Sequence, residues 1–186
     1  MTEPAGLTAD LVEYGQDALA VWRAAVARVT PADLSRPTPC AEFTVADLAD
    51  HVQRSMVLLA GAAGTELDVD AGRPSLEQSV PLAAAALAVW AQRGVDGSVP
   101  VGSLTYPAEK AYAIVLMELA VHGWDLDRAL GAPAPELPGP LGDYLLAAAP
   151  QLITPDRRGR AFAEEVAVDV EAALVDRLVG FTGRRP

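Results

Sequence analysis

The sequence has very little positive charge. Lys110 is the only lysine, lysine and arginine together number 14 against 25 aspartates and glutamates, and the formal net charge is −11. Binding to the phosphates of nucleic acids or to anionic membranes requires a basic surface, and a chain with this excess of acidic residues shows no such basic footprint. The composition therefore argues against a nucleic-acid partner and against docking on a membrane surface.

Cysteine and long apolar runs are scarce as well. Cys40 is the only cysteine, which excludes an internal disulfide framework. No run of 18 or more apolar residues is free of charge, so a membrane-spanning helix is not expected. The N-terminal residues Met-Thr-Glu-Pro-Ala-Gly lack the basic and apolar regions of a signal peptide. We therefore expect a soluble, acidic, cytoplasmic protein.

The residues that are abundant favour helices. Hydrophobic residues make up 51% of the chain but aromatic residues only 5%, and alanine, leucine and valine account for most of the apolar content. Apolar residues recur at helical spacing in four long segments, at about residues 9–29, 44–61, 76–93 and 107–130. We predict an all-α protein, a four-helix bundle with a short C-terminal extension, and a single domain over residues 1–186.

Local signals define the ends of these helices and the segments between them. Thr8 is a plausible N-cap, and Thr44 with Asp47 forms a variant capping box. Pro107 suits the first position of a helix, and Gly131 suits a helix end. Residues 95–105 read as a turn-rich loop, whereas the C-terminal extension predicts a helix over 141–150, a short extended piece over 166–170 and a helix over 172–181.

A carboxylate and an imidazole lie one turn apart in the fourth predicted helix. Glu118 and His122 both fall on its core-facing stripe, so both side chains can reach one cation from one face. A carboxylate buried without a partner would cost several kcal/mol or would be neutralised. His51, the only other histidine, borders the apolar stripe of the second predicted helix. We therefore predict a metal site of His51, Glu118 and His122, although a lone core histidine and a hydrogen-bonded Glu–His pair are the plainer alternatives.

Three further residues are candidates for supporting roles. Asp125 follows His122 by three positions and Asp47 precedes His51 by four, so each could accept the second N–H of a ligand histidine. Helix capping is the simpler role for Asp47. Cys40 precedes a helix N-terminus, which would lower the pKa of its thiol, but a small packed side chain is the simpler interpretation. The catalytic residues stay unassigned.

Several motifs together resemble a known family, the actinobacterial branch of the DinB/YfiT-like metal-binding superfamily, near the metal-binding domain of mycothiol-dependent maleylpyruvate isomerase. The matching segments are Pro37-Thr38-Pro39-Cys40, Phe43-Thr44-Val45 with Asp47, Leu48 and His51, Glu118 with Val121-His122-Gly123-Trp124-Asp125-Leu126, and Arg160, Phe162, Asp176-Arg177-Leu178, Gly183-Arg184 and Pro186 near the end. Phe43 stands where many relatives have tryptophan. The resemblance implies a four-helix bundle with a divalent metal held by His51, Glu118 and His122.

The resemblance implies less about the reaction. Relatives include thiol-dependent isomerases and S-transferases in which a metal activates a low-molecular-weight thiol, so the leading hypothesis is a metal-dependent, mycothiol-type thiol transferase. Isomerase activity is not carried over, because the isomerase has an additional domain that contributes to its active site. A metal-dependent hydrolase with Asp125 as general base, and a non-catalytic metal-binding or small-molecule-binding bundle, are the alternatives.

The proposed site would need a divalent metal and a small-molecule partner. Zinc is the expected metal, nickel and iron stay open because the ligands alone do not fix the metal, and mycothiol is the candidate co-substrate. The expected partner is a small-molecule substrate or a low-molecular-weight thiol, and a homo-oligomer is left open. A thiol pocket would need cationic groups, for which the clustered candidates are Arg157, Arg158, Arg160 and Arg184.

Overall fold

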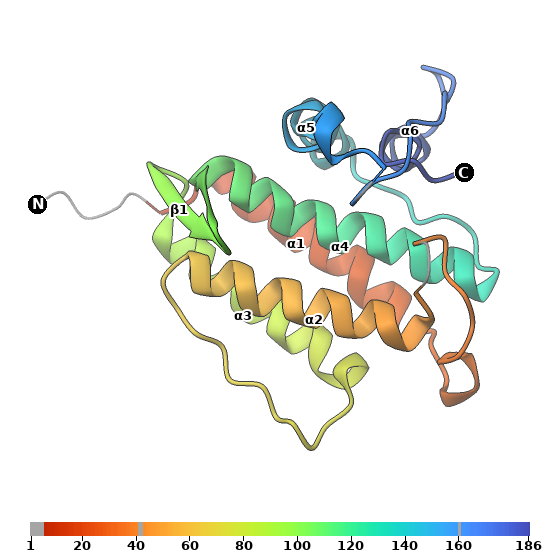
Figure 1. Cartoon of the computed structure of the whole chain (residues 1–186), viewed down its shortest axis with the longest axis horizontal. Coiled ribbons are helices and arrows are strands. Elements are labelled where there is room, and N and C mark those ends of the chain that lie inside the picture. Colours follow the sequence, from red (N-terminus) through yellow and green to blue (C-terminus); the bar gives the residue numbers. More distant parts are fainter. Residues whose placement is uncertain (1–5, 41–42, 160) are drawn as a thin grey trace, which may run out of the picture.

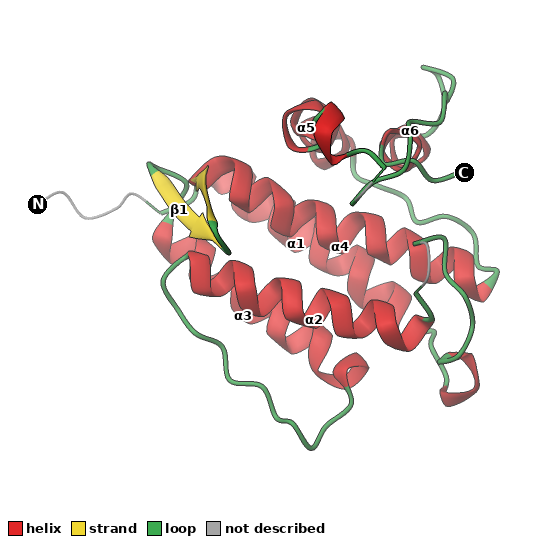
Figure 2. Ribbon diagram, in the orientation of Figure 1, coloured by secondary structure: helices red, strands yellow, loops and turns green. Residues whose placement is uncertain are grey.

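The computed structural model describes residues 6–40, 43–159 and 161–186. Its elements are α1 (Ala9–Val26), α2 (Val45–Ala62), α3 (Ser75–Arg93), β1 (Ser98–Val101), β2 (Leu104–Pro107), α4 (Ala108–Leu130), α5 (Gly139–Leu152) and α6 (Leu174–Phe181), with short 3-10 turns at Pro31–Asp33 and Pro155–Arg157. Helices α1 and α2 each pack against both α3 and α4, which forms the four-helix bundle (Figures 1 and 2). The predicted all-α bundle with a C-terminal extension is confirmed.

The predicted helix ends agree closely with the structure. The Thr8 hydroxyl accepts a hydrogen bond from Leu11 N–H at 3.4 Å, and Thr44 and Asp47 form the reciprocal bonds of a capping box. Gly131 ends α4 in the left-handed region, at φ 71°. These ends were predictable because caps are formed by residues within one turn of each other.

Two expectations were wrong in detail. Residues 95–105 are not only loop, because Ser98–Val101 and Leu104–Pro107 pair as an antiparallel hairpin that turns at Gly102, with φ 61° (Figure 2). The first helix ends at Val26, because the backbone hydrogen bonds of Arg28 and Val29 have the tighter i to i−3 spacing. Residues 166–170, predicted to be a short extended piece, contain no helix and run along α6, where Val166 N–H donates to Gly180 O at 3.0 Å.

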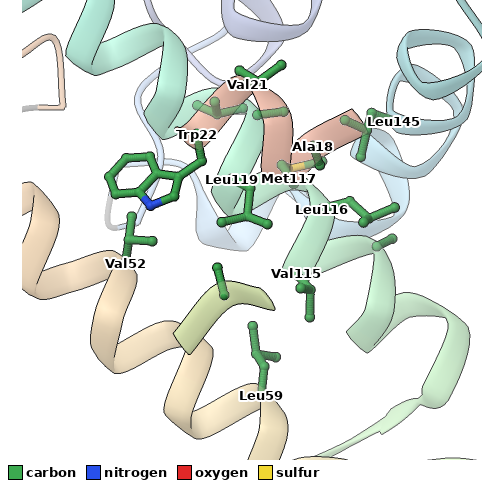
Figure 3. Packing of buried hydrophobic residues seen from close by; sticks show 14 of the residues in the cluster. Ala18, Val21, Trp22, Val52, Leu59, Val115, Leu116, Met117, Leu119 and Leu145 are labelled. Atoms are coloured by element: carbon green, nitrogen blue, oxygen red, sulfur yellow. The ribbon is translucent and has the colours of Figure 1, made fainter. Parts of the chain in front are cut away.

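The core is built around large side chains from several helices. Trp22, Trp90, Trp124 and Tyr112 are fully or almost fully buried. Trp22 points from α1 towards Val52 of α2, with Leu119 of α4 close by (Figure 3). Its indole N–H donates to the hydroxyl of Ser79 at 3.2 Å, which ties α1 to α3. Buried indoles that find a hydrogen-bond partner contribute apolar burial without an unpaired donor.

Helix α4 lies at the centre of the molecule. The bundle covers one side of it, while α5 and α6 cover the side away from α2 (Figure 1), so most of its residues are buried. The sequence predicted a single core-facing stripe, and the C-terminal helices are the reason that the burial extends around the helix. Gly123 allows α1 to approach closely, since an added Cβ would lie 2.7 Å from the Val21 side chain. No described helix is both long and apolar enough to cross a membrane.

Candidate metal centre

The structure brings the three predicted ligands together between α2 and α4. His51 Nε2 lies 3.0 Å from Glu118 Oε2, and His122 Nε2 lies 3.6 Å from the same oxygen. The two imidazole rings meet edge to face, with centroids 4.9 Å apart. One ligand atom from each of the three residues lies within 4.8 Å of the others. A single cation could therefore contact all three side chains.

Local structure explains why these side chains converge. The capping box fixes the start of α2 at Val45, so His51 is presented on the second turn of that helix. Phe43 packs against the His51 ring, with centroids 5.4 Å apart. Glu118 and His122 are four residues apart on α4, a spacing that places side chains on one face of a helix.

The Glu118 carboxylate has an unsatisfied oxygen in this cluster. Its Oε2 is buried and accepts no hydrogen bond from any described residue, although two imidazole nitrogens lie nearby. Burial raises the pKa of Glu118 most strongly, but the neighbouring His51, His122 and Ser55 together outweigh burial and leave that pKa below its usual value. A buried anionic oxygen without a donor, facing two imidazole nitrogens, is the arrangement that a divalent cation would satisfy.

Asp125 lies where the sequence predicted, beside His122. Its Oδ2 is 2.8 Å from His122 Nδ1, and its side chain is completely buried. Burial raises the pKa of Asp125 most strongly, but hydrogen bonds with His122 and Arg184 outweigh burial and lower that pKa. A carboxylate at Nδ1 favours the tautomer that carries the ring proton there, and in that tautomer Nε2 can bind a cation.

Asp47 is engaged in capping rather than with His51. Its Oδ2 accepts a hydrogen bond from Thr44 N–H at 3.0 Å and another from the Thr44 hydroxyl at 2.5 Å. These bonds lower the pKa of Asp47. No hydrogen bond between Asp47 and His51 is present among the described residues, and the capping role that was the simpler expectation for Asp47 is the one that its side chain has.

Cys40 lies at the edge of the same cluster. Its Sγ, a His122 ring nitrogen and an Asp125 oxygen lie within 4.8 Å of one another. Burial raises the pKa of the Cys40 thiol to about 11, with the nearby Arg184 opposing the rise. The interpretation of Cys40 as a thiol activated by the helix N-terminus is therefore not favoured, since the thiol form predominates at neutral pH.

We expect Cys40→Ser to leave metal binding and turnover nearly unchanged and to lower thermal stability modestly. The reason is that Cys40 packs against the core as a small side chain and carries no thiolate at neutral pH. Zinc affinity and a thermal melt of wild type and variant would check this expectation. Complete loss of turnover with the metal still bound would show that the thiol takes part in the chemistry.

The arginines expected to line a thiol pocket have other partners. Arg157 contacts the Tyr106 hydroxyl and lies over its ring, and Arg158 donates to the carbonyl of Phe181. Arg184 pairs with Asp125. Arg160 lies outside the described residues. The sequence analysis named these side chains as candidate cationic groups of a thiol pocket and missed the pairing of Arg184 with Asp125, for which no local signal exists.

Comparisons with known proteins place this site in a family. The family model described as the mycothiol maleylpyruvate isomerase N-terminal domain matches residues 16–127. The chain belongs to this family. The match includes His51, Glu118, His122 and Asp125, and it lies within a DinB-like superfamily, as the sequence motifs indicated. Membership associates the domain with metals and with mycothiol, a low-molecular-weight thiol.

Close relatives of this family member occur in Mycobacterium tuberculosis. Uncharacterized protein MT0763 of strain CDC 1551 / Oshkosh and Uncharacterized protein Rv0738 of strain ATCC 25618 / H37Rv are each 32% identical over 179 residues. Each alignment covers 92% of this chain and 94% of the relative. No solved structure matches significantly. The similarity to these relatives thus continues beyond residue 127, into the C-terminal extension.

Proposed function

We propose that this protein is a metal-dependent enzyme that joins a low-molecular-weight thiol of the mycothiol type to an electrophilic substrate. The observation that supports this function best is the buried, unpartnered Oε2 of Glu118, which faces the Nε2 atoms of both histidines. The chain belongs to a family named for a mycothiol-dependent isomerase, and this membership supports mycothiol as the type of thiol.

His51, Glu118 and His122 would hold the cation. Two imidazoles and one carboxylate form a set that catalytic zinc sites use, with a coordination position left for a further ligand. Iron and nickel accept the same donors, so zinc is proposed on frequency of use rather than on geometry. A divalent cation there would supply a Lewis acid that lowers the pKa of a coordinated thiol or water.

The surrounding residues have supporting tasks. Asp125 orients the His122 ring, and Phe43 packs against the His51 ring, so that both Nε2 atoms face Glu118. The low pKa of Glu118 keeps its carboxylate ionised and ready to offset the charge of a cation. In the reaction, the thiol would lose its proton to solvent and its sulfur would add to an electrophilic carbon of a multiple bond in the substrate, whose displaced π-electron pair would take up a proton from solvent.

The hydrolase alternative requires a general base, and Asp125 was its candidate. That side chain has no exposed surface, and both of its oxygens are engaged by His122 and Arg184. It is therefore poorly placed to take a proton from an attacking water. The thiol transferase is the function we carry forward, and a non-catalytic binding role is an outcome that the experiment below would reveal.

We expect the purified protein to contain about one divalent metal ion per chain, because the histidines and Glu118 form one cluster. Elemental analysis after purification without chelators or metal-affinity resin would measure it. Turnover would be followed by mass spectrometry of the mycothiol adduct of a panel of electrophiles.

A metal-free protein that gains no thermal stability from zinc, nickel or iron would overturn the proposal. Hydrolysis without thiol would favour the hydrolase, and tight binding of thiol without turnover would favour the binding role. Glu109→Gln provides a control for metal loss, because Glu109 is an exposed glutamate at the start of the same helix.

We also propose that residues 1–186 act as one domain. The match to the family model ends at residue 127. Beyond it, α5 and α6 pack on α4, and Arg184 pairs with Asp125 at the proposed metal centre. A cooperative unfolding transition with coincident spectroscopic probes would support this organisation.

A further inference from the structure

The guanidinium of Arg184, near the C-terminal end of the chain, is nearly buried and lies beside the candidate metal centre. Arg184 follows α6, and its side chain is only 9% exposed. Its Nε donates to Asp125 Oδ1 at 3.0 Å, and its Nη2 donates to Asp125 Oδ2 at 2.7 Å. This two-point pairing fixes the plane of the carboxylate as well as its charge.

The backbone before Arg184 is rigidly organised. Gly183 has φ +92° and its N–H donates to Gly180 O at 2.9 Å, while Arg184 N–H donates to Val179 O at 3.0 Å. These two bonds are those of a Schellman motif, which ends a helix with a left-handed glycine. The Thr182 hydroxyl also accepts a bond from Arg184 Nη1 at 3.2 Å. The guanidinium is therefore held in place by the end of α6 as well as by Asp125.

The carboxylate that Arg184 holds is the one that contacts His122. Asp125 Oδ2 lies 2.8 Å from His122 Nδ1 and 2.7 Å from Arg184 Nη2. A fully buried carboxylate is stable only when it is paired, so its position depends on both neighbours. A chain of contacts thus runs from the C-terminal segment through Asp125 to a proposed metal ligand.

We infer that Arg184 is a positioning residue of the metal centre, holding Asp125 so that His122 keeps its proton on Nδ1 and presents Nε2 to the cation. The inference rests on the metal site proposed above. It assigns Arg184 a task different from binding a thiol or substrate, since Asp125 and Thr182 engage all three of its nitrogens. It also makes the C-terminal segment, which lies outside the family match, a part of the centre.

The test measures metal affinity in single and double variants. Zinc affinity would be determined by competition with a chromophoric chelator, and the visible spectrum of the cobalt-loaded protein would report ligand geometry. We expect Arg184→Met to weaken zinc binding about 10- to 100-fold, the range typical for partners of metal ligands. The zinc affinity of Arg184→Lys should lie between those of wild type and Arg184→Met, because an ammonium keeps the charge but cannot pair with the carboxylate at two points.

A double-mutant cycle shows whether Arg184 acts through Asp125. In an Asp125→Asn background, Arg184→Met should cause no further loss of zinc affinity, because the contact that it would break is already weakened. This double variant also leaves no buried charge unpaired, so it keeps the test valid if Arg184→Met alone fails to fold.

Arg158→Met is the matched control. Arg158 lies in the same C-terminal extension with a similarly covered side chain, 13% exposed, and it donates to the carbonyls of Ala163 and Phe181. We expect this variant to lower the melting temperature but to leave zinc affinity and the cobalt spectrum unchanged, because Arg158 contacts neither Asp125 nor a ligand.

Two results would overturn the inference while leaving the metal centre standing. One is an Arg184→Met protein that binds zinc as tightly as wild type. The other is an equal loss of affinity from Arg184→Met with and without Asp125→Asn, which would show that Arg184 does not act through Asp125. A wild-type protein that binds no metal would instead overturn the proposed function, and this inference with it.

Discussion

Replacing His51 with alanine is expected to weaken divalent-metal binding by at least about 100-fold while the bundle remains folded. Even partners of metal ligands typically account for 10- to 100-fold in affinity, and His51 would be a ligand itself. Its side chain is 32% exposed, so its loss should leave the core almost intact. Chelator competition measures the affinity, and circular dichroism confirms folding.

Substitutions of the other two proposed ligands, Glu118 and His122, should also weaken metal binding. Glu118→Gln keeps the shape of the side chain but removes the negative charge, so affinity should fall strongly. His122→Ala removes a ligand and also leaves Asp125 without one of its two partners, so it should be at least as harmful. Glu109→Gln and the exposed substitution Arg54→Ala should bind metal like wild type.

The His51 variant is decisive because His51 comes from a different helix than the other two residues. If His51→Ala binds metal as tightly as wild type, the centre does not span α2 and α4, and the thiol transferase loses its basis. If His51→Ala and His122→Ala lose metal but Glu118→Gln binds it as tightly as wild type, the assignment of Glu118 as a ligand would be wrong.

Trp22→Ala is expected to cost about 3–5 kcal/mol of the free energy of unfolding, the range for removing a buried large aromatic side chain. Trp22 has no exposed surface and points from α1 towards Val52 of α2 (Figure 3). Since a small protein is usually stable by only about 5–15 kcal/mol, this loss takes a large share of the total. Urea unfolding of metal-free protein measures it.

Two milder variants separate packing from hydrogen bonding at this position. Trp22→Phe keeps most of the apolar volume, and Ser79→Ala removes the acceptor of the indole N–H. Ser79→Ala should cost about 1–3 kcal/mol, the penalty for leaving a buried donor unpaired. A loss below about 1 kcal/mol for Trp22→Ala would contradict the prediction, because it would require the core to close over the cavity almost completely.

The features predicted best are those that residues near one another decide. The Thr44–Asp47 capping box and the glycine stop at Gly131 depend on neighbours within one turn, so they could be read from the chain directly. The spacing of Glu118 and His122 likewise places both on one helix face. His51 was assigned to the same site because the sequence offers only one other histidine.

The features missed depend on pairing between segments. The strands Ser98–Val101 and Leu104–Pro107 are only four residues each, and neither shows a strand pattern alone, because each is stabilised by the other. The burial of α4 on several sides follows from the packing of α5 and α6, which the periodicity of α4 does not encode.

The sequence by itself determined the helices, their ends, the acidic charge and the residues that could bind a metal. These depend on composition and on spacings within a few turns. Only the tertiary structure decided that Glu118 Oε2 is buried without a donor and that Asp125 is held by Arg184, 59 residues away. Such pairings arise because packing brings distant segments together, and a buried charge is then tolerated only where another segment supplies its partner.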